Sequence, residues 1–318
     1  MLGFTIDSIN LFVSWEQLTN FDFNNFTELI NAKKITNGKY KEWSEGNYKN
    51  FYIKFNEDFG IYIMGSISVF FAGNISLLEY NQLEKAIEKL GYDLSLELHL
   101  ARLYRVDLAL NIITDFPVNH YTYTLFTDLP RFKRLEQDEG VLFKTTETAF
   151  SIYNKKQQLI DKKKIEISEN LLRLEFRILK NVSKKLLIKK MKIRDLYNPA
   201  TYKLLVSKYL MYYREIKKQT VLVDLDEMKN ITPTSFTNIL KRNSIENTFK
   251  GEYAAYKFIE QADKEGKFKT ANDKSRCKKI IDNFSKDKSI SKLHPLVEEI
   301  NIKVESACDE ILKKLNLI

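Results

Sequence analysis

Three short segments of the chain alternate apolar side chains with polar or ionisable ones. They are residues 104–113 (YRVDLALNII), 148–155 (TAFSIYNK) and 171–179 (LLRLEFRIL). Period-two alternation is typical of β-strands, whose successive side chains point to opposite faces. If the three strands are neighbours, their polar sides meet in one patch. That patch would hold Arg105, Asp107, Asn111, Ser151, Tyr153, Lys155, Arg173, Glu175 and Arg177.

These residue types together suit phosphoryl transfer. Asp107 and Glu175 could hold a divalent cation such as Mg²⁺ or Mn²⁺, because such ions prefer oxygen ligands. The cation and the nearby basic groups would offset negative charge in the transition state. Tyr153 would be the nucleophile; a phenol has a pKa of about 10, so its attack needs the cation, Lys155, Lys156 or a base. The other interpretation is an exposed sheet surface with weak ion pairs and a partly buried tyrosine.

The first half of the chain reads as the sheet that would position this patch. Three more segments are rich in aromatic and β-branched residues, as strands are: residues 4–13, 49–56 and 60–72. One helix is expected over residues 79–91, with Gly91 at its C-cap. The stretch 114–147 is polar and gives no clear pattern.

After residue 190 the pattern becomes helical, and prolines lie close to several expected helix starts. Helices are expected near residues 199–218, 234–243, 251–264, 272–284 and 293–316. The sequence therefore predicts an α+β fold. An antiparallel-sheet catalytic domain would span residues 1–190, and a mostly helical, basic, DNA-binding region would span residues 191–318.

Basic residues are unevenly distributed along the 318-residue chain, whose formal net charge is +9. Between Lys180 and Lys218 there are 12 basic and two acidic residues, with Tyr197, Tyr202, Tyr209, Tyr212 and Tyr213 among them. Cations mixed with planar side chains suit phosphate contact and base stacking, although a solvated helix face has the same composition. The predicted DNA-binding residues are Lys156, Arg177, Lys184, Lys185, Lys189, Lys190, Lys192 and Arg194.

The sequence predicts a protein of the bacterial host cytoplasm. The N-terminal residues lack the pattern of a signal peptide, and no apolar run is long enough to cross a bilayer. Cys277 and Cys308 are far apart and show no metal-ligand spacing, which favours a reducing compartment. Membrane association is not expected.

The order of the motifs resembles that of two related groups of replication proteins. An Arg-hydrophobic-Asp strand comes first (RVDLALN, 105–111), then a Tyr-x-Lys segment (IYNKKQQ, 152–158), then an Arg-hydrophobic-Glu strand (LRLEFRI, 172–178). This order is similar to that of the gene II initiators of filamentous phages and their phage/plasmid relatives, and of the replication-transfer initiators of small rolling-circle plasmids. Residues 65–74 (GSISVFFAGN) look like the strand and turn that precede the motifs. The resemblance covers roughly residues 1–190.

The resemblance implies that Tyr153 is the nucleophile and that Asp107 and Glu175 are the metal-site carboxylates. Arg173 and Lys155 would be supporting cations. The chain departs from the plasmid pattern at two positions, where Asn111 and Gln158 stand in place of acids. The cation, Mg²⁺ or Mn²⁺, would then be held by the two carboxylates with the amide of Asn111 or water.

Histidine spacing narrows the kind of metal site. Many rolling-circle nickases bind their metal through a His-hydrophobic-His pair. The only histidines here are His99, His120 and His294, none at that spacing. A paired-histidine site is excluded and a carboxylate site remains.

The function implied is that of a rolling-circle replication initiator, which nicks and rejoins one DNA strand through a 5′-phosphotyrosine intermediate. Its partners would be origin DNA, single-stranded or as a hairpin, and the host replication helicase and polymerase. The second strand transfer would use another tyrosine or the partner subunit of a homodimer.

Two rival interpretations remain open at this point. One is a non-catalytic origin-binding protein that kept the fold, which Asn111 and Gln158 favour. The other is a tyrosine recombinase, for which His99 and Arg102 supply a His-x-x-Arg pattern and Tyr209, Tyr212 or Tyr213 would be the nucleophile.

Overall fold

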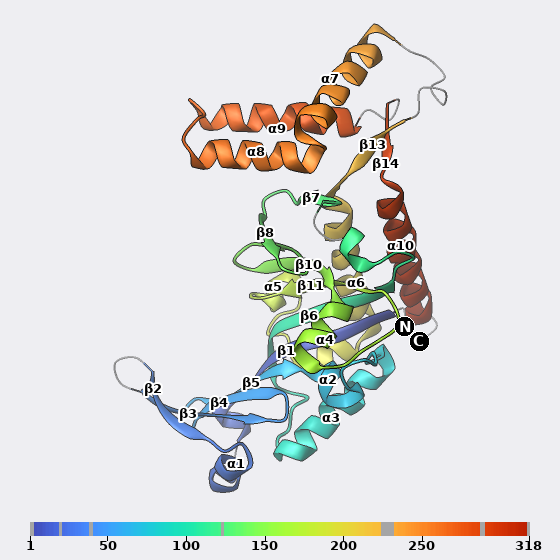
Figure 1. Ribbon diagram of the computed structural model, residues 1–318. Coiled ribbons are helices and arrows are strands. Elements are labelled where there is room, and N and C mark those ends of the chain that lie inside the picture. Colours follow the sequence, from blue (N-terminus) through green and yellow to red (C-terminus); the bar gives the residue numbers. More distant parts are fainter. Residues whose placement is uncertain are drawn as a thin grey trace.

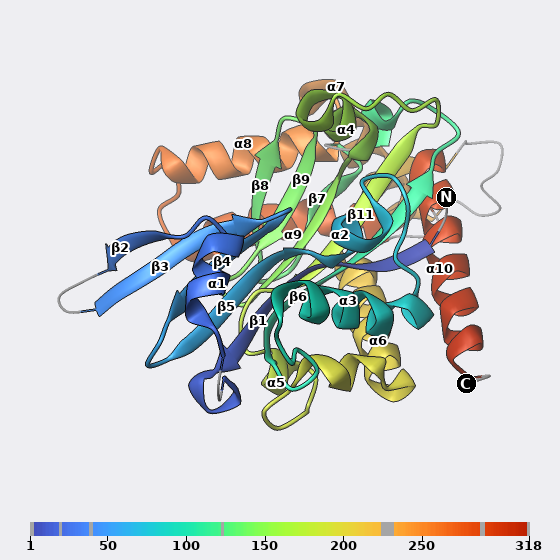
Figure 2. The same ribbon diagram turned by 90° about the horizontal axis from the view of Figure 1, so that it is seen from below.

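A computed structural model describes residues 3–18, 21–37, 41–121, 124–223, 232–286 and 290–316 (Figure 1). Ten strands in the described part form one antiparallel sheet. In spatial order they are β2 (Lys33–Asn37), β3 (Lys41–Tyr48), β4 (Phe51–Asn56), β5 (Gly60–Ser66), β1 (Gly3–Ser14), β6 (Arg102–Ile113), β11 (Leu171–Ile178), β10 (Thr148–Asn154), β9 (Gly140–Lys144) and β8 (Lys133–Gln137). Figure 2 shows the β2–β3 hairpin extending from one side of the molecule.

Helices follow the strands more densely toward the C-terminus, and the expected α+β class is confirmed. The described helices are α1 (Phe23–Leu29), α2 (Ile67–Ala72), α3 (Leu83–Leu94), α4 (Lys155–Lys163), α5 (Val182–Lys185), α6 (Pro199–Glu215), α7 (Pro233–Phe249), α8 (Glu252–Lys264), α9 (Ala271–Lys286) and α10 (Pro295–Asn316). Proline occupies the first position of α6, α7 and α10, where its missing N–H has no helical partner to lose.

One face of the sheet is apolar and carries the main core. Leu108, Leu174 and Phe150 are fully buried there, and α3, α6 and α10 contribute side chains to the same cluster. The ring of Phe4 on β1 contacts that of Tyr209 on α6 edge to face, with ring centroids 5.0 Å apart. The core is thus continuous across residue 190, from the sheet into α6 and α10.

Three tyrosines of α6 pack into this core. Tyr202, Tyr209 and Tyr213 are fully buried, and the hydroxyl of Tyr213 donates to Asn301 Oδ1 on α10 at 2.6 Å. Their burial excludes base stacking by these three rings and gives them a packing role. The reason is that α6 is covered on two sides, by the sheet and by α10, so that its aromatic residues point inward.

Two boundaries differ from the sequence expectation because of local capping and packing. Residues 60–72 were expected as one strand, but β5 ends at Ser66, whose Oγ accepts from the backbone N–H of Val69 and starts α2. The expected C-cap Gly91 lies inside α3, which continues to Leu94. A Cβ at Gly91 would lie 2.6 Å from the carbonyl oxygen of Leu96, so the glycine permits a close approach of the chain.

Residues 233–286, here called the helical unit, form α7, α8 and α9 apart from the sheet (Figure 1). Two short antiparallel strands, β13 (Thr220–Leu222) and β14 (Ser291–Leu293), connect it to the rest of the chain. It has a small core of its own that includes Ala255, Ile259 and Ile281.

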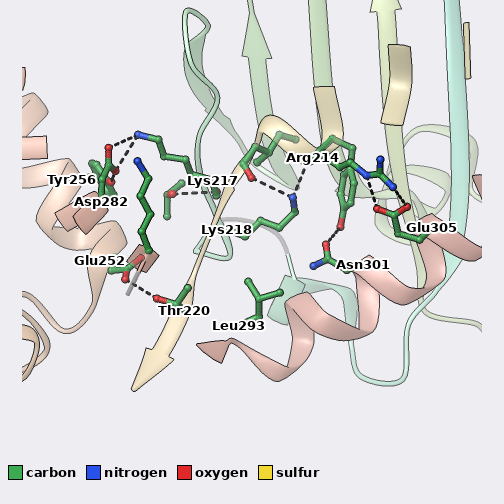
Figure 3. Close-up of a pocket in the computed structure, with 14 residues that line it drawn as sticks. Arg214, Lys217, Lys218, Thr220, Glu252, Tyr256, Asp282, Leu293, Asn301 and Glu305 are labelled. Atoms are coloured by element: carbon green, nitrogen blue, oxygen red, sulfur yellow. Dashed lines mark hydrogen bonds and ion pairs between the residues drawn. The ribbon is translucent and has the colours of Figure 1, made fainter. Parts of the chain in front are cut away.

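Charged contacts fix the helical unit at this junction. Arg242, fully buried, donates to Glu252 Oε1 and to the carbonyl oxygen of Thr220. Figure 3 shows Lys217 reaching Asp282, with Nζ 2.8 Å from Oδ2. Lys217 belongs to β12 (Lys217–Lys218), which pairs with β7 (Phe126–Asp128) in the stretch that gave no sequence pattern. A cavity of about 410 Å³ lies between these contacts and α10.

Candidate active site on the polar face of the sheet

The three polar strands are direct neighbours, in the order β6–β11–β10. Tyr153 lies opposite Arg173, which lies opposite Asn111 in turn. One row further along, Glu175 faces Ser151. The polar sides therefore converge on the face opposite the core. We call this set the polar patch: Asp7, Arg105, Asp107, Asn111, Ser151, Tyr153, Lys155, Arg173, Glu175 and Arg177.

Each carboxylate predicted as a metal ligand is paired with an arginine on its own strand. Arg105 donates to Asp107 through Nε at 2.9 Å and Nη2 at 2.5 Å. Arg177 Nη2 donates to Glu175 Oε2 at 2.6 Å. Residues two apart on a strand point to the same face, so the alternating Arg and acidic residues meet side by side. The carboxylates are buried and the two arginines stay partly exposed, so guanidinium groups form the outer surface of the patch.

The environment of Asp107 disfavours its charged form. Burial is the main cause and the charge of Glu175 adds to it, and together they raise the pKa of Asp107 to about 7 despite the hydrogen bonds from Arg105. Glu175 lies diagonally across from Asp107, since Asp107 faces Arg177 and Ala109 faces Glu175. Two buried carboxylates thus approach one another on adjacent strands.

Asp7 is a third carboxylate in the patch, and the sequence analysis missed it. Its Oδ1 lies 3.4 Å from Arg173 Nη1 and accepts from Ser66 Oγ at 3.2 Å. The pairing of β1 with β6 shifts register between Ile6 and Ile9, so a bulge turns Asp7 to the polar face. The available signal was the adjacent polar pair Asp7-Ser8, which interrupts the alternation of residues 4–13.

Tyr153 is half-buried near the end of β10. Burial and the charge of Glu175 raise the pKa of its phenol above the ordinary value, and the charge of Arg173 opposes them. On its other side Tyr153 faces Gly140 of β9. A Cβ at Gly140 would lie 2.7 Å from the Cα of Tyr153 and closer still to the carbonyl oxygen of Ile152. The glycine therefore lets β9 lie against the strand that carries the tyrosine.

Lys155 reaches the patch from the first turn of α4. Asn154 caps this helix by accepting from the backbone N–H of Gln157 at 3.0 Å. Lys155 Nζ donates to Gln158 Oε1 at 2.7 Å. Burial, with the charge of Arg173, lowers the pKa of Lys155 to about 8. Gln158 thus holds the Lys155 amine through a hydrogen bond. A glutamate at position 158, as the plasmid pattern has, would form an ion pair with the same amine.

Of the other predicted DNA-binding residues, Arg177 lies in the polar patch, Lys156 follows Lys155 on α4, and the basic residues after β11 lie away from Tyr153. Lys156 Nζ donates to the carbonyl oxygen of Ser168 at 2.9 Å. Lys185 pairs at 2.9 Å with Glu147, which precedes β10, whereas Tyr153 is near the other end of that strand. The remaining members follow the same segment, whose apolar residues enter the main core: Lys184, Lys189, Lys190, Lys192 and Arg194.

The oxygen donors of the patch suit a hard cation in chemical type, but they are engaged by arginines. Asn111 Oδ1 accepts from Arg173 Nε at 2.7 Å, just as Asp107 and Glu175 accept from Arg105 and Arg177. No group of three or more His, Cys, Asp or Glu side chains in the described residues lies in position to hold a metal ion. A cation at Asp107 and Glu175 would therefore require Arg105 and Arg177 to turn outward, which their partial exposure permits.

No known family model matches the chain, and no curated protein does either. Over the described ranges, every helix is too short or too polar to cross a membrane.

Proposed function

We propose that this protein nicks and rejoins one strand of DNA, with Tyr153 as the nucleophile, and that it initiates rolling-circle replication. The observation that supports this most is the row on the polar face in which the half-buried tyrosine stands opposite the buried Arg173, with Glu175 one row further along. A nucleophile, a fixed cation and an acid on adjacent strands form the arrangement that phosphoryl transfer needs.

In the proposed reaction Tyr153 Oη attacks the phosphorus of one phosphodiester. The bond from phosphorus to the 3′ oxygen breaks, and the proton lost by the phenol is balanced by the one that the released 3′ hydroxyl gains. The 5′ phosphate stays on the tyrosine, so the reverse reaction can join a strand without ATP. The free 3′ end would prime the host polymerase, with the host helicase opening the duplex.

The arginines would offset charge on the transferring phosphate. Arg173 is held by Asn111 and Asp7, which fixes its guanidinium beside Tyr153 before any strand binds. Arg105 and Arg177 are partly exposed and could turn toward a phosphate. Lys155, whose pKa is lowered to about 8, has a neutral amine fraction near neutral pH and would accept the phenolic proton.

A divalent cation, Mg²⁺ or Mn²⁺, is also part of the proposal. Asp107 and Glu175 would hold it, with the oxygen of Asn111 or water. Such an ion would polarise the phosphate and weaken the P–O bond that breaks.

The buried state of the α6 tyrosines favours Tyr153 over the recombinase alternative. Tyr209 and Tyr213 are fully buried, and burial raises the pKa of both phenols well above 10. Only Tyr212 of that group is partly exposed. The ion pairs that occupy both carboxylates favour the rival interpretation, a non-catalytic DNA-binding protein. The experiment must therefore distinguish strand cleavage from binding alone.

The test uses a pool of single-stranded oligonucleotides of random sequence, labelled with a fluorophore at the 3′ end, with Mn²⁺. Attack by Tyr153 leaves the labelled fragment attached to protein, so a fluorescent adduct survives denaturing electrophoresis. Peptide mass mapping should place the adduct on Tyr153, and Tyr153→Phe should abolish it.

The matched control is Tyr92→Phe, which removes a hydroxyl from an exposed tyrosine on α3, outside the polar patch. It should form adduct as the wild type does. A recombinase tyrosine would keep the 3′ phosphate, so that scheme is tested with the pool labelled at the 5′ end. An adduct that persists in Tyr153→Phe and disappears in Tyr212→Phe would then establish it. Binding of the pool without any adduct, with the same result on supercoiled plasmid carrying the replicon's own origin, would establish the non-catalytic binder.

A further inference from the structure

Five aromatic rings form a continuous strip on the solvent face of the sheet. We call it the aromatic strip: Phe12, Trp43, Phe59, Tyr62 and Tyr104. Phe12 and Tyr62 have ring centroids 4.5 Å apart, and Tyr104 lies 6.1 Å from Phe12. Trp43 lies 6.0 Å from Tyr62 and 6.1 Å from Phe59, to which it is nearly parallel. The strip crosses β6, β1, β5 and β3 and reaches the β4–β5 turn.

The aromatic strip lies on the same face as the polar patch. Tyr62 is opposite Phe12, two residues along β1 from Asn10, and Asn10 is opposite Arg105. The pairing of β1 with β6 shifts register between Asn10 and Leu11, so Tyr104 can lie on the same face as its neighbour Arg105, the partner of Asp107. The helices α3, α6 and α10 cover the other face, so the strip and the patch form one surface.

These rings are accessible where a solvated sheet face ordinarily carries polar residues. Tyr104 is 45% exposed and Phe59 39% exposed, and the other three are partly exposed. Flat rings held at fixed spacing by strands are suited to stacking against other flat rings. Unpaired nucleic-acid bases expose such surfaces, whereas bases inside a duplex are already stacked.

The charges around the strip favour a polyanion. Lys54 Nζ lies 4.8 Å from the ring centroid of Trp43. Arg102 is exposed and faces Phe12 across the β1–β6 pair, and Arg105 is partly exposed. Among the nearby acids, Glu45 accepts from Tyr52 Oη, whereas Glu57 and Asp58 are exposed in the β4–β5 turn, so Lys54, Arg102 and Arg105 are the groups that would meet phosphates.

We propose that the aromatic strip binds single-stranded nucleic acid by base stacking, with Lys54, Arg102 and Arg105 contacting its phosphates. The inference deepens the proposed function, because the bound strand would be the one that Tyr153 cuts. Tyr153 on β10 lies in the same row as Asn111 on β6, two strands away. Asn111 is seven residues along β6 from Tyr104, so Tyr153 lies roughly 25 Å from Tyr104. A single-stranded site of about 4–16 nucleotides covers that distance.

The test measures binding without cleavage, in Tyr153→Phe protein with a chelator. The chain has two tryptophans, so Trp15→Phe leaves Trp43 as the only one. An oligothymidine of about 20 nucleotides is titrated at low salt while Trp43 fluorescence and the anisotropy of a labelled oligonucleotide are followed. Stacking should quench Trp43 as the strand binds, and a duplex of equal length should not quench it.

Tyr104→Ala and Phe59→Ala should each weaken binding at least about fivefold, the effect of losing one stacked base. Both side chains are too exposed for truncation to disturb the core. Tyr92→Ala is the matched control and should change nothing, since Tyr92 is 87% exposed on α3, the helix on the other face.

The aromatic strip would be overturned as a binding site if the strand bound without quenching Trp43. It would also be overturned if the affinity were unchanged in both Tyr104→Ala and Phe59→Ala. Failure of the protein to bind any single strand would overturn it as well. An adduct on Tyr153 together with such a result would leave the proposed cleavage standing. Quenching that depends on Tyr104 and Phe59, without any adduct under cleavage conditions, would support the strip and refute the nicking activity.

Discussion

Replacing Asp107 by asparagine should make the protein increasingly more stable than the wild type as pH rises. Asp107 is 1% exposed and its pKa is raised to about 7, whereas an aspartate in an unfolded chain ionises near pH 4. Between these values the folded protein holds a proton that the unfolded chain has released. The free energy of unfolding therefore falls by about 1.4 kcal/mol per pH unit from this group.

Asparagine has nearly the same shape and does not titrate. The stability contributed by the protonated carboxyl is complete below about pH 4 and is lost as pH rises through about 7. From about pH 5 to pH 8, the Asp107→Asn variant should gain about 3 kcal/mol relative to the wild type. Titrating groups that do not interact with Asp107 are common to both proteins and cancel in the difference.

The assay is urea unfolding of both proteins at several pH values across that range, with equal slopes checked. Asp58→Asn, in the exposed β4–β5 turn, is the control for the substitution itself. Adding Mn²⁺ at the upper end should narrow the difference, since a cation stabilises the ionised carboxylate. A difference that stays constant with pH, or that favours the wild type as pH rises, would refute the assignment of a costly buried charge to Asp107.

Three other changes test the molecule at separate places. Mn²⁺ affinity, measured by calorimetry, should rise about tenfold per pH unit up to about pH 7, because the ion competes with the proton on Asp107. Gly140→Ala should cost about 1–3 kcal/mol in chemical unfolding and lower the yield of Tyr153 adduct, since the new Cβ meets the β10 backbone. Glu252→Gln should cost about 3–5 kcal/mol, seen as faster hydrogen exchange in the helical unit, since the buried Arg242 loses its closer anionic partner and keeps only Glu246, at 3.4 Å.

Two of these results have a control in the same chain. For the metal titration, Asp107→Asn should bind more weakly and lose the pH dependence. For the buried pair, Glu265→Gln removes an exposed partner of Lys267 and should leave exchange unchanged. Slow exchange in Glu252→Gln, equal to that of the wild type, would mean that Arg242 is satisfied by Thr220 and Glu246 alone.

Alternation was sufficient to predict the strands that carry the polar patch. Arg105, Asp107, Arg173 and Glu175 lie on uninterrupted period-two segments, and their strands proved to be adjacent. β6 and β11 are neighbours in the sheet although β7, β8, β9 and β10 lie between them in the chain, so their adjacency could only be supposed from the sequence. The fold class followed from the change of pattern near residue 190.

The rest depended on interactions that one-dimensional patterns do not contain. Asp7 joins the patch through a bulge, whose position is set by pairing with β6. The charge state of Asp107 depends on how deeply β6 and β11 are covered. Tyr209 reads as an ordinary tyrosine on a basic helix, and only the packing of α6 between sheet and α10 shows that it is buried. The aromatic strip collects residues from strands that are far apart in the chain.

The two strands that connect the helical unit would allow it to be an evolutionary insertion into the rest of the chain. The backbone N–H of Val223 donates to the carbonyl oxygen of Ile290 at 2.9 Å, so the segment leaves and returns at one point. A tight two-residue turn can close such a pair of strands. The sheet could therefore fold without the helical unit. Other segments could replace the helical unit between β13 and β14 without changes to the main core. The helical unit and the sheet would then be free to evolve as separate parts of one gene.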